Sequence, residues 1–149
     1  MKFKFKLESV LKIRKHELKI EKQKLAAKIH QQNELEIKYE NHLKNLKSAA
    51  KHKDEGGQTA NQNREKMFQN YLLIETRMLN QLSEKITQKK QEVNQQRKAV
   101  TEANKQVQMI EKLKNKALME YQMEADREEQ RFQNEIATQM YHRQPKSWI

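Results

Sequence analysis

The sequence predicts an all-α protein in which two long helices pair as an antiparallel coiled-coil hairpin. Three observations lead to this prediction. Turn-forming residues are scarce, with two glycines and one proline in 149 residues, so the segments between turns must be long. Leu, Ile and Val recur every seventh residue in both halves of the chain, which is typical of a coiled-coil seam. The two glycines, Gly56 and Gly57, are adjacent and mark the place where we expect the chain to reverse.

The first helix is predicted over residues 7–54. Its apolar side chains keep one heptad phase, with Gln32 as a polar exception, and this stripe consists of Leu11, Leu18, Leu25, Tyr39 and Leu46. A second stripe follows four residues further on and contains Ile29, Leu43 and Ala50. A repeat of seven residues keeps such stripes facing a partner helix and favours a left-handed supercoil.

The second helix is predicted over residues 63–142, after a loop at 55–62. It carries a more regular heptad stripe, made of Leu72, Leu79, Ile86, Val93, Val100 and Val107. Part of the other seam comes from Leu82, Ala103, Ile110 and Ala117. Pro145 disfavours helix before it, so residues 143–149 are expected to form a short tail. We expect a single coiled-coil domain over residues 1–149.

The pairing register is left open by the sequence. A simple hairpin centred near Gly57 would pair Leu46 with about residue 69 and Leu11 with about residue 104. The second helix would then extend beyond the start of the first. A separate short helix over "MFQNYLLIETRM" would instead shift the register and bring the two termini together.

The charge is unevenly distributed. The net charge is +11, and residues 1–53 hold 15 basic and 6 acidic residues, so the first helix carries most of the excess. Such a surface attracts an acidic protein, a nucleic acid or an anionic lipid. No stretch approaches the roughly 20 apolar residues that cross a bilayer, and the charged N-terminus does not resemble a signal peptide. We therefore expect a soluble or peripheral protein.

Catalytic and metal-binding patterns are missing. There is no Gly-rich phosphate-binding loop, and without cysteine the chain has no thiol nucleophile, disulfide or Cys-based zinc site. The five histidines never pair with one another at the spacing of four that a helical metal site needs. Two thin helices also offer no deep pocket for carboxylates. We expect no enzyme activity, no cofactor and no metal.

The N-terminal segment differs from the rest of the chain. Phe3 and Phe5 alternate with lysines in "MKFKFKLESVLKIR", whereas helical spacing begins at Leu7. Two aromatic side chains in a basic terminus need a contact that shields them from water. Packing against the C-terminal helix and packing against a partner protein are both open. Membrane attachment through so short a segment would be weak.

The two ends of the chain resemble a known family. Phe3, Phe5, Leu7, Val10, Leu11, Arg14 and Glu17 have the spacing of the N-terminal signature of the flagellar export protein FliJ family. The stretch "EANKQVQMIEKLKNKALMEYQMEADREEQRFQNEI" is similar to that family's C-terminal block, on the residues Glu111, Lys112, Leu113, Lys114, Tyr121, Glu124, Glu128 and Glu135. Asn134 stands where the family usually has Asp. "FQNYLLIETRMLNQL" resembles the middle segment more loosely.

This resemblance implies a role in the flagellar type III export apparatus, and with it in flagellum biogenesis, motility and chemotaxis. Members are cytoplasmic antiparallel coiled coils, similar to the central stalk of rotary ATP synthases. They are expected to enter the hexameric export ATPase ring, promote its assembly and contact the transmembrane export gate, at the cytoplasmic face of the inner membrane at the flagellar base. Some members also handle export chaperones.

Two sets of binding residues follow from this resemblance together with the residue pattern. The ATPase-binding set is Phe3, Phe5, Leu7, Leu11, Arg14, Lys112, Lys114 and Tyr121. The gate-binding set lies near the bend, where apolar and aromatic side chains, Met67 among them, exceed the needs of one seam. It comprises Tyr39, Leu43, Phe68, Tyr71 and Leu72. Closure of the hairpin tip explains the same excess, so both interpretations stay open.

Two other functions are compatible with the residues alone. A basic coiled coil binds nucleic acid without any motif, because phosphate attraction is independent of sequence. No basic-region, zinc-finger or RNP-like pattern is present, and we expect no nucleic-acid partner. The last alternative is a generic structural coiled coil with no export role.

Overall fold

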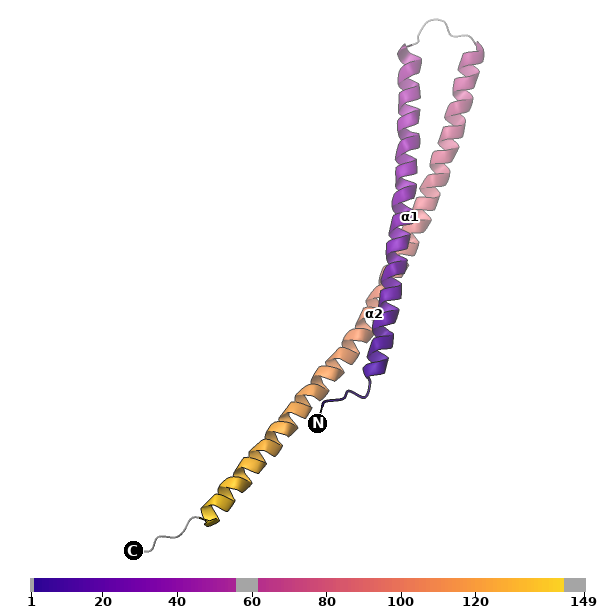
Figure 1. Ribbon diagram of the computed structural model, residues 1–149. Coiled ribbons are helices and arrows are strands. Elements are labelled where there is room, and N and C mark those ends of the chain that lie inside the picture. Colours follow the sequence, from indigo (N-terminus) through magenta and orange to yellow (C-terminus); the bar gives the residue numbers. More distant parts are fainter. Residues whose placement is uncertain (1, 56–61, 144–149) are drawn as a thin grey trace. The chain divides into compact units, whose positions relative to one another are not determined.

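The computed structural model describes residues 2–55 and 62–143. It contains two helices in this part of the chain, α1 (Glu8–Glu55) and α2 (Gln62–Arg143), of 48 and 82 residues. They pack against each other and run in opposite directions, so the predicted antiparallel helical hairpin is confirmed (Figure 1). The ranges expected from the sequence differ from these bounds by one residue at each end. The predicted reversal at Gly56 and Gly57 and the tail after Arg143 lie outside the described residues.

The composition explains why both helices run so long. Lys, Glu, Gln, Ala and Leu dominate them, and all five are good helix formers. Glu8 and Glu65 lie in the first turns, and His142 and Arg143 lie in the last turn of α2. The two carboxylates and the Arg143 guanidinium oppose the partial charges of the helix ends beside them, which stabilises the terminal turns. The chain before α1 enters it through a turn in which the Glu8 amide donates to the Phe5 carbonyl at 3.2 Å.

Contacts divide the chain into two compact units. We call Met1–Glu17 with Asn104–Ile149 the terminal unit, and Leu18–Ala103 the bend unit. In the terminal unit, Leu11 and Val107 are buried between the helices. In the bend unit, the buried side chains are Leu79, Leu82 and Val93 on α2. All five were expected at seam positions from the heptad pattern.

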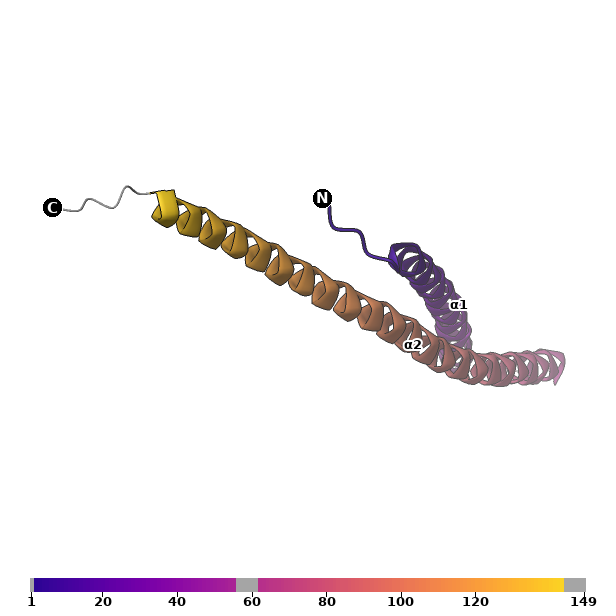
Figure 2. The ribbon, with the colours of Figure 1, turned by 90° about the horizontal axis from the view of Figure 1, so that it is seen from below.

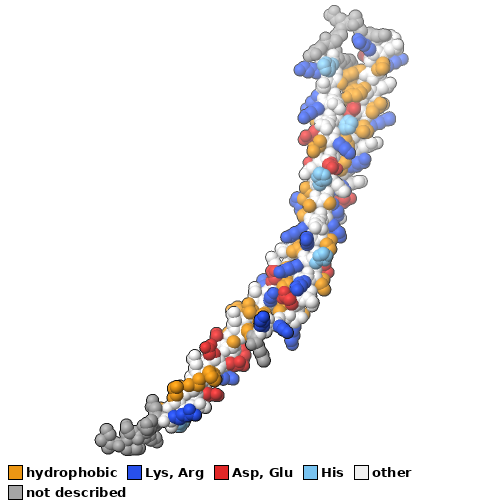
Figure 3. Space-filling view, in the orientation of Figure 1, with side chains coloured by type: hydrophobic (Ala, Val, Ile, Leu, Met, Phe, Trp, Pro, Cys, Tyr) orange, Lys and Arg blue, Asp and Glu red, His pale blue; other side chains and the backbone are white. Residues whose placement is uncertain are grey.

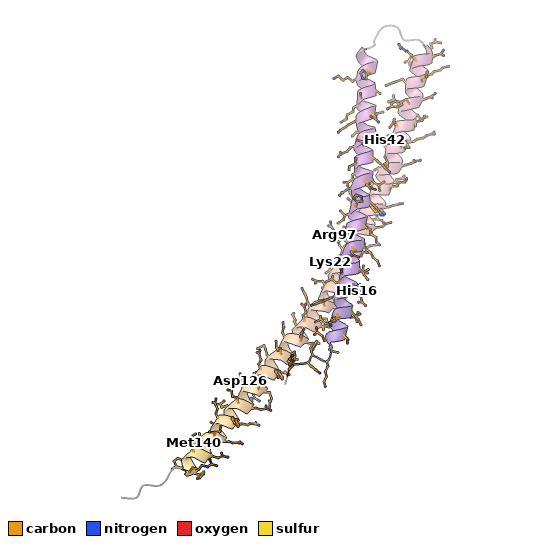
Figure 4. The ribbon with its side chains drawn as sticks, viewed as in Figure 1. His16, Lys22, His42, Arg97, Asp126 and Met140 are labelled. Carbon is orange, nitrogen blue, oxygen red and sulfur yellow. The ribbon has the colours of Figure 1, made fainter. Side chains whose placement is uncertain are left out.

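The bend unit also buries polar side chains in its seam. Glu75 and Gln96 on α2 are only 9% and 7% exposed. His42 of α1 points towards α2 (Figure 4), and its Nδ1 lies 2.7 Å from a carboxylate oxygen of Glu75. Gln96 donates from its amide nitrogen to the backbone carbonyl and the carboxylate of Glu21 and accepts a bond from Lys28 at 3.4 Å. These bonds satisfy groups whose burial alone would be costly.

The register differs from that of the simple hairpin. In the bend unit, His42 lies beside Glu75, where simple pairing places about residue 73. In the terminal unit, Glu8 lies beside Lys114, where simple pairing places about residue 107. The seam contacts and polar pairs therefore determine the register, rather than the midpoint of the glycine pair. The alternative with a separate short helix over residues 67–78 is wrong, because α2 runs through this segment without a break.

Within the terminal unit, α2 continues past the start of α1. Figure 2 shows this part of α2, coloured towards yellow, beyond the N-terminal segment. Every side chain over residues 121–143 is exposed. They include Met123, Phe132, Ile136 and Met140, which are 54%, 63%, 37% and 63% exposed. This part of α2 thus gains no support from burial against the described part of α1.

Candidate functional site

The segment before α1 lies along α2 as an extended strap, which we define as residues 2–7. The rings of Phe3 and Tyr121 are 5.5 Å apart between centroids and tilted by 50°, a favourable geometry for an aromatic pair. Phe3 and Phe5 are half-buried, whereas Lys2, Lys4 and Lys6 are exposed. The alternation of Phe and Lys is therefore explained by an extended chain with one side against a helix, and residues 2–5 form neither helix nor strand.

Two ion pairs join the first turns of α1 to α2 close to the strap. The Nζ of Lys114 is 2.8 Å from a carboxylate oxygen of Glu8, and the Nζ of Lys15 is 3.7 Å from one of Glu111. The hydrogen bond from Lys114 is the main reason why the pKa of Glu8 is lowered from its usual value of 4.5. Both pairs are largely exposed, so they determine geometry more than they add stability.

A groove lies between the strap and α2. Its volume is about 600 Å³, and it is lined by residues 4–7 on one side and by Leu113, Lys116, Ala117 and Glu120 on the other. Leu7 and Leu113 are 39% and 50% exposed, so the apolar floor is open to solvent. This groove is the candidate functional site, because it combines exposed apolar surface with several charged side chains at its edge.

The residues expected to bind the ATPase occupy different environments. Phe3, Phe5 and Tyr121 contact or line the strap side of α2, and Leu7 lines the groove. Leu11 is 2% exposed, so its side chain packs inside the hairpin and offers no surface to a partner. Arg14 binds Glu17 of its own helix at 3.1 Å, Lys114 binds Glu8, and Lys112 is exposed. The structure thus brings part of this set together around the groove.

The residues expected to bind the export gate lie in the bend unit and are all half-buried. They are Tyr39, Leu43, Phe68, Tyr71 and Leu72. A more exposed stripe lies beside them, in which Met67, Ile74 and Met78 are 71%, 59% and 39% exposed. Met67 was expected in the apolar patch near the bend, whereas Ile74 and Met78 were not. Together with Tyr71 they follow one another at spacings of four, three and four residues, which places them on one face of α2. This spacing in the sequence could have identified the stripe.

The C-terminal part of α2 presents a third surface. Six acidic and two basic residues fall between residues 119 and 136, so this stretch is acidic in a basic protein. Asp126 and Met140 are labelled on it in Figure 4, and acidic and hydrophobic side chains are both visible there in Figure 3. The terminal unit therefore changes from basic around the strap to acidic further along α2.

The described residues contain no cluster of three or more His, Asp or Glu side chains placed to hold a metal ion. In residues 8–55 and 62–143, neither helix has a stretch that is long and apolar enough to span a membrane. The groove holds lysines, one carboxylate and apolar side chains, which suits recognition of another molecule.

Comparison with known proteins gives one family match. The family model described as "Flagellar FliJ protein" matches residues 3–146, which is nearly the whole chain. Searches of curated proteins and of solved structures gave no match. The family match includes both the strap and the C-terminal part of α2, and the helical hairpin agrees with what that resemblance implied. The chain belongs to the FliJ family of flagellar proteins and is a component of the flagellar export apparatus.

Proposed function

We propose that this protein binds the hexameric flagellar export ATPase through its terminal unit and promotes assembly of the ring as a central, stalk-like rod. Family membership supports partners within the export apparatus. The observation that carries the proposal is the strapped groove, because it gives the terminal unit a binding surface with open apolar area and a basic edge. The protein acts as a binding component and not as an enzyme.

Electrostatics supports the same proposal. The excess positive charge of residues 1–53 attracts an acidic lining in the ring. Attraction between exposed charges weakens as salt shortens the Debye length, which is about 8 Å at physiological ionic strength. Association with the ring should therefore slow as salt is added, while dissociation, which depends on apolar contacts, changes less.

The test removes the strap except for Leu7. Deleting residues 2–6 should leave the hairpin folded, because the buried seam begins at Leu11. It should abolish stimulation of hexamer formation, measured as ATPase activity against ATPase concentration with the intact and the shortened chain. Circular dichroism checks that helix content is unchanged. Equal stimulation by both chains would exclude the strap from the ring contact.

A second contact is proposed for the bend unit, which we assign to the transmembrane export gate. The stripe formed by the exposed Met67, Ile74 and Met78 with the half-buried Tyr71 supports it, because exposed apolar side chains on one helix face are typical of a protein-binding surface. Met78→Ala and Ile74→Ala should reduce motility without changing the urea midpoint of unfolding. A parallel loss of stability and motility would instead make the stripe part of the hairpin's own packing.

These contacts would place the protein at the cytoplasmic face of the inner membrane at the flagellar base, peripherally and through the apparatus. The same position would allow it to handle export chaperones. The acidic stretch of α2 argues against nucleic-acid binding by the terminal unit, because its carboxylates repel phosphates. Weak, salt-independent binding to random DNA would support this exclusion, whereas tight, salt-sensitive binding would overturn it.

A further inference from the structure

The groove in the terminal unit carries lysines on both of its sides. Lys4 and Lys6 of the strap and Lys116 of α2 line it, and all three side chains are exposed. None of the three forms an ion pair with another residue in the part of the chain that the structure describes. Two neighbouring lysines, Lys15 and Lys114, already hold carboxylates of α1 and α2. Lysines of this unit therefore already bind carboxylates, and the three lysines of the groove are available to bind carboxylates of a partner.

The floor of the groove is apolar. Phe5, Leu7, Leu113 and Ala117 line it, and Leu7 and Leu113 keep 39% and 50% of their surface exposed. The volume of about 600 Å³ exceeds that of a single side chain, so a short stretch of peptide fits. From the sequence, packing of Phe3 and Phe5 against the C-terminal helix and packing against a partner were both open. In the structure both side chains are half-buried, and Phe5 lines the groove.

One carboxylate also lies in the groove. Glu120 lines it on α2 and is followed along this helix by the exposed Glu124 and Asp126. The contact of Phe3 with Tyr121 places Glu120 at the end of the groove where the strap begins. A segment that binds with acidic residues near Lys6 and Lys116 would bring its next residues close to Glu120, where a basic side chain is favoured and an acidic one is repelled.

We propose that this groove binds a partner peptide segment in which an apolar side chain stands between carboxylates and is followed by a basic residue. The proposal deepens the proposed function, since it rests on the ATPase ring being the partner and gives the chemistry of the ring segment that is recognised. The apolar side chain fills the floor over Leu7 and Leu113. The carboxylates pair with the exposed lysines, and the basic residue pairs with Glu120.

A lipid surface is the less favoured occupant. An anionic bilayer is extended, so it would also face the acidic residues between 119 and 136 and be repelled by them. A peptide segment is short enough to contact the lysines and the apolar floor without meeting the acidic stretch beyond Glu120. The charge pattern therefore favours a short peptide that carries both acidic and basic residues over a uniformly anionic membrane surface.

The first test uses two labelled synthetic peptides with the intact protein. One has Leu and Phe between glutamates and ends in lysine, and the other has every charge inverted. Fluorescence anisotropy should show saturable binding of the first peptide only. The variant Lys4→Glu/Lys6→Glu/Lys116→Glu should weaken that binding by about tenfold or more. The control Lys44→Glu/Lys47→Glu/Lys98→Glu has the same net charge and alters exposed lysines of the bend unit, so it should bind almost as the parent does.

The second test uses the purified export ATPase. A photo-crosslinking residue at position 116 should form its adduct on a ring segment that carries Asp or Glu beside an apolar side chain, identified by mass spectrometry. Adducts on a segment without carboxylates, equal binding of both peptides, or acidic-peptide binding that survives the triple groove substitution would overturn the proposal. Lysine-dependent binding to phosphatidylserine vesicles, without peptide binding, would assign the groove to lipid instead and overturn it as well.

The two proposals fail in different ways. If the intact protein stimulates the ATPase and the groove variant does so equally, the groove proposal is wrong and the proposed function stands. If the intact protein neither binds nor stimulates the ATPase but binds the acidic peptide in the groove, the proposed function is wrong and the groove chemistry stands. Circular dichroism of each variant ensures that a loss of binding does not come from unfolding, because all six substituted lysines are exposed.

Discussion

Replacing His42 by leucine should destabilise the protein, although leucine suits a coiled-coil seam. The substitution leaves the Glu75 carboxylate without its partner, and that side chain is only 12% exposed. We expect a cost of about 1–3 kcal/mol, which is less than the roughly 3–5 kcal/mol for breaking a fully buried pair, because His42 itself is 27% exposed. Replacing both residues by leucine removes the stranded carboxylate. The variant His42→Leu/Glu75→Leu should therefore match or exceed the parent in stability.

The assay is urea unfolding followed by circular dichroism at neutral pH. With a slope of about 2 kcal/mol per molar urea, His42→Leu should lower the midpoint by about 0.5–1.5 M. A matched control exists on the same helix, where His30 lies 3.0 Å from Glu34 and both side chains are well exposed. His30→Leu should change the free energy of unfolding by less than about 0.5 kcal/mol. Equal effects of the two substitutions would refute the claim that the buried pair matters.

Three further predictions follow from single contacts. Val93→Asp should unfold the hairpin, because this side chain is 3% exposed and an unpaired buried charge is strongly unfavourable, whereas Asn94→Asp beside it should have little effect on the helix signal at 222 nm. Because the pKa of Glu8 is lowered, its pair with Lys114 stabilises the folded state above pH 4.5, and this stabilisation is lost as the pH falls through the lowered pKa. The amide resonance of Glu8 should therefore titrate below pH 4.5, and Glu8→Gln should abolish that titration. Lys89→Ala should raise the pKa of the Glu92 carboxyl towards its usual 4.5, measured by carbon NMR, since the hydrogen bond from Lys89 is the largest cause of its lowered value; an unchanged pKa would contradict this assignment.

The helices and the apolar seam were predictable from the sequence because they depend on local composition and on a repeat of seven. Leu79, Val93 and Val107 keep one phase along α2, and all three are buried. A heptad repeat of apolar residues can be recognised in the sequence without knowing which residues of the two helices face each other. For the strap, the alternation of Phe and Lys showed only that the segment is not helical. It did not show which part of the chain the segment packs against.

The polar part of the seam could not be read in the same way. His42, Glu75 and Gln96 are hydrophilic side chains, and each is favourable in the seam only because a particular residue on the other helix satisfies it. Their burial depends on the pairing register of the two helices, which the sequence does not determine. The exposure of Ile74 and Met78 could not be predicted either, because they are as apolar as buried residues and differ only in the helix face on which they lie.

The contact between Phe3 and Tyr121 affects what happens while the chain is being synthesised. A ribosome adds about 5–20 residues per second, so the N-terminal aromatic side chains leave it several seconds before the part of α2 that covers them. During that interval Phe3 and Phe5 are displayed on a basic, unfolded terminus, next to a first helix that has no second helix to pair with. The nascent chain therefore offers chaperones an aromatic and basic segment that the finished protein partly hides. Completion of α2 is the event that ends this exposure.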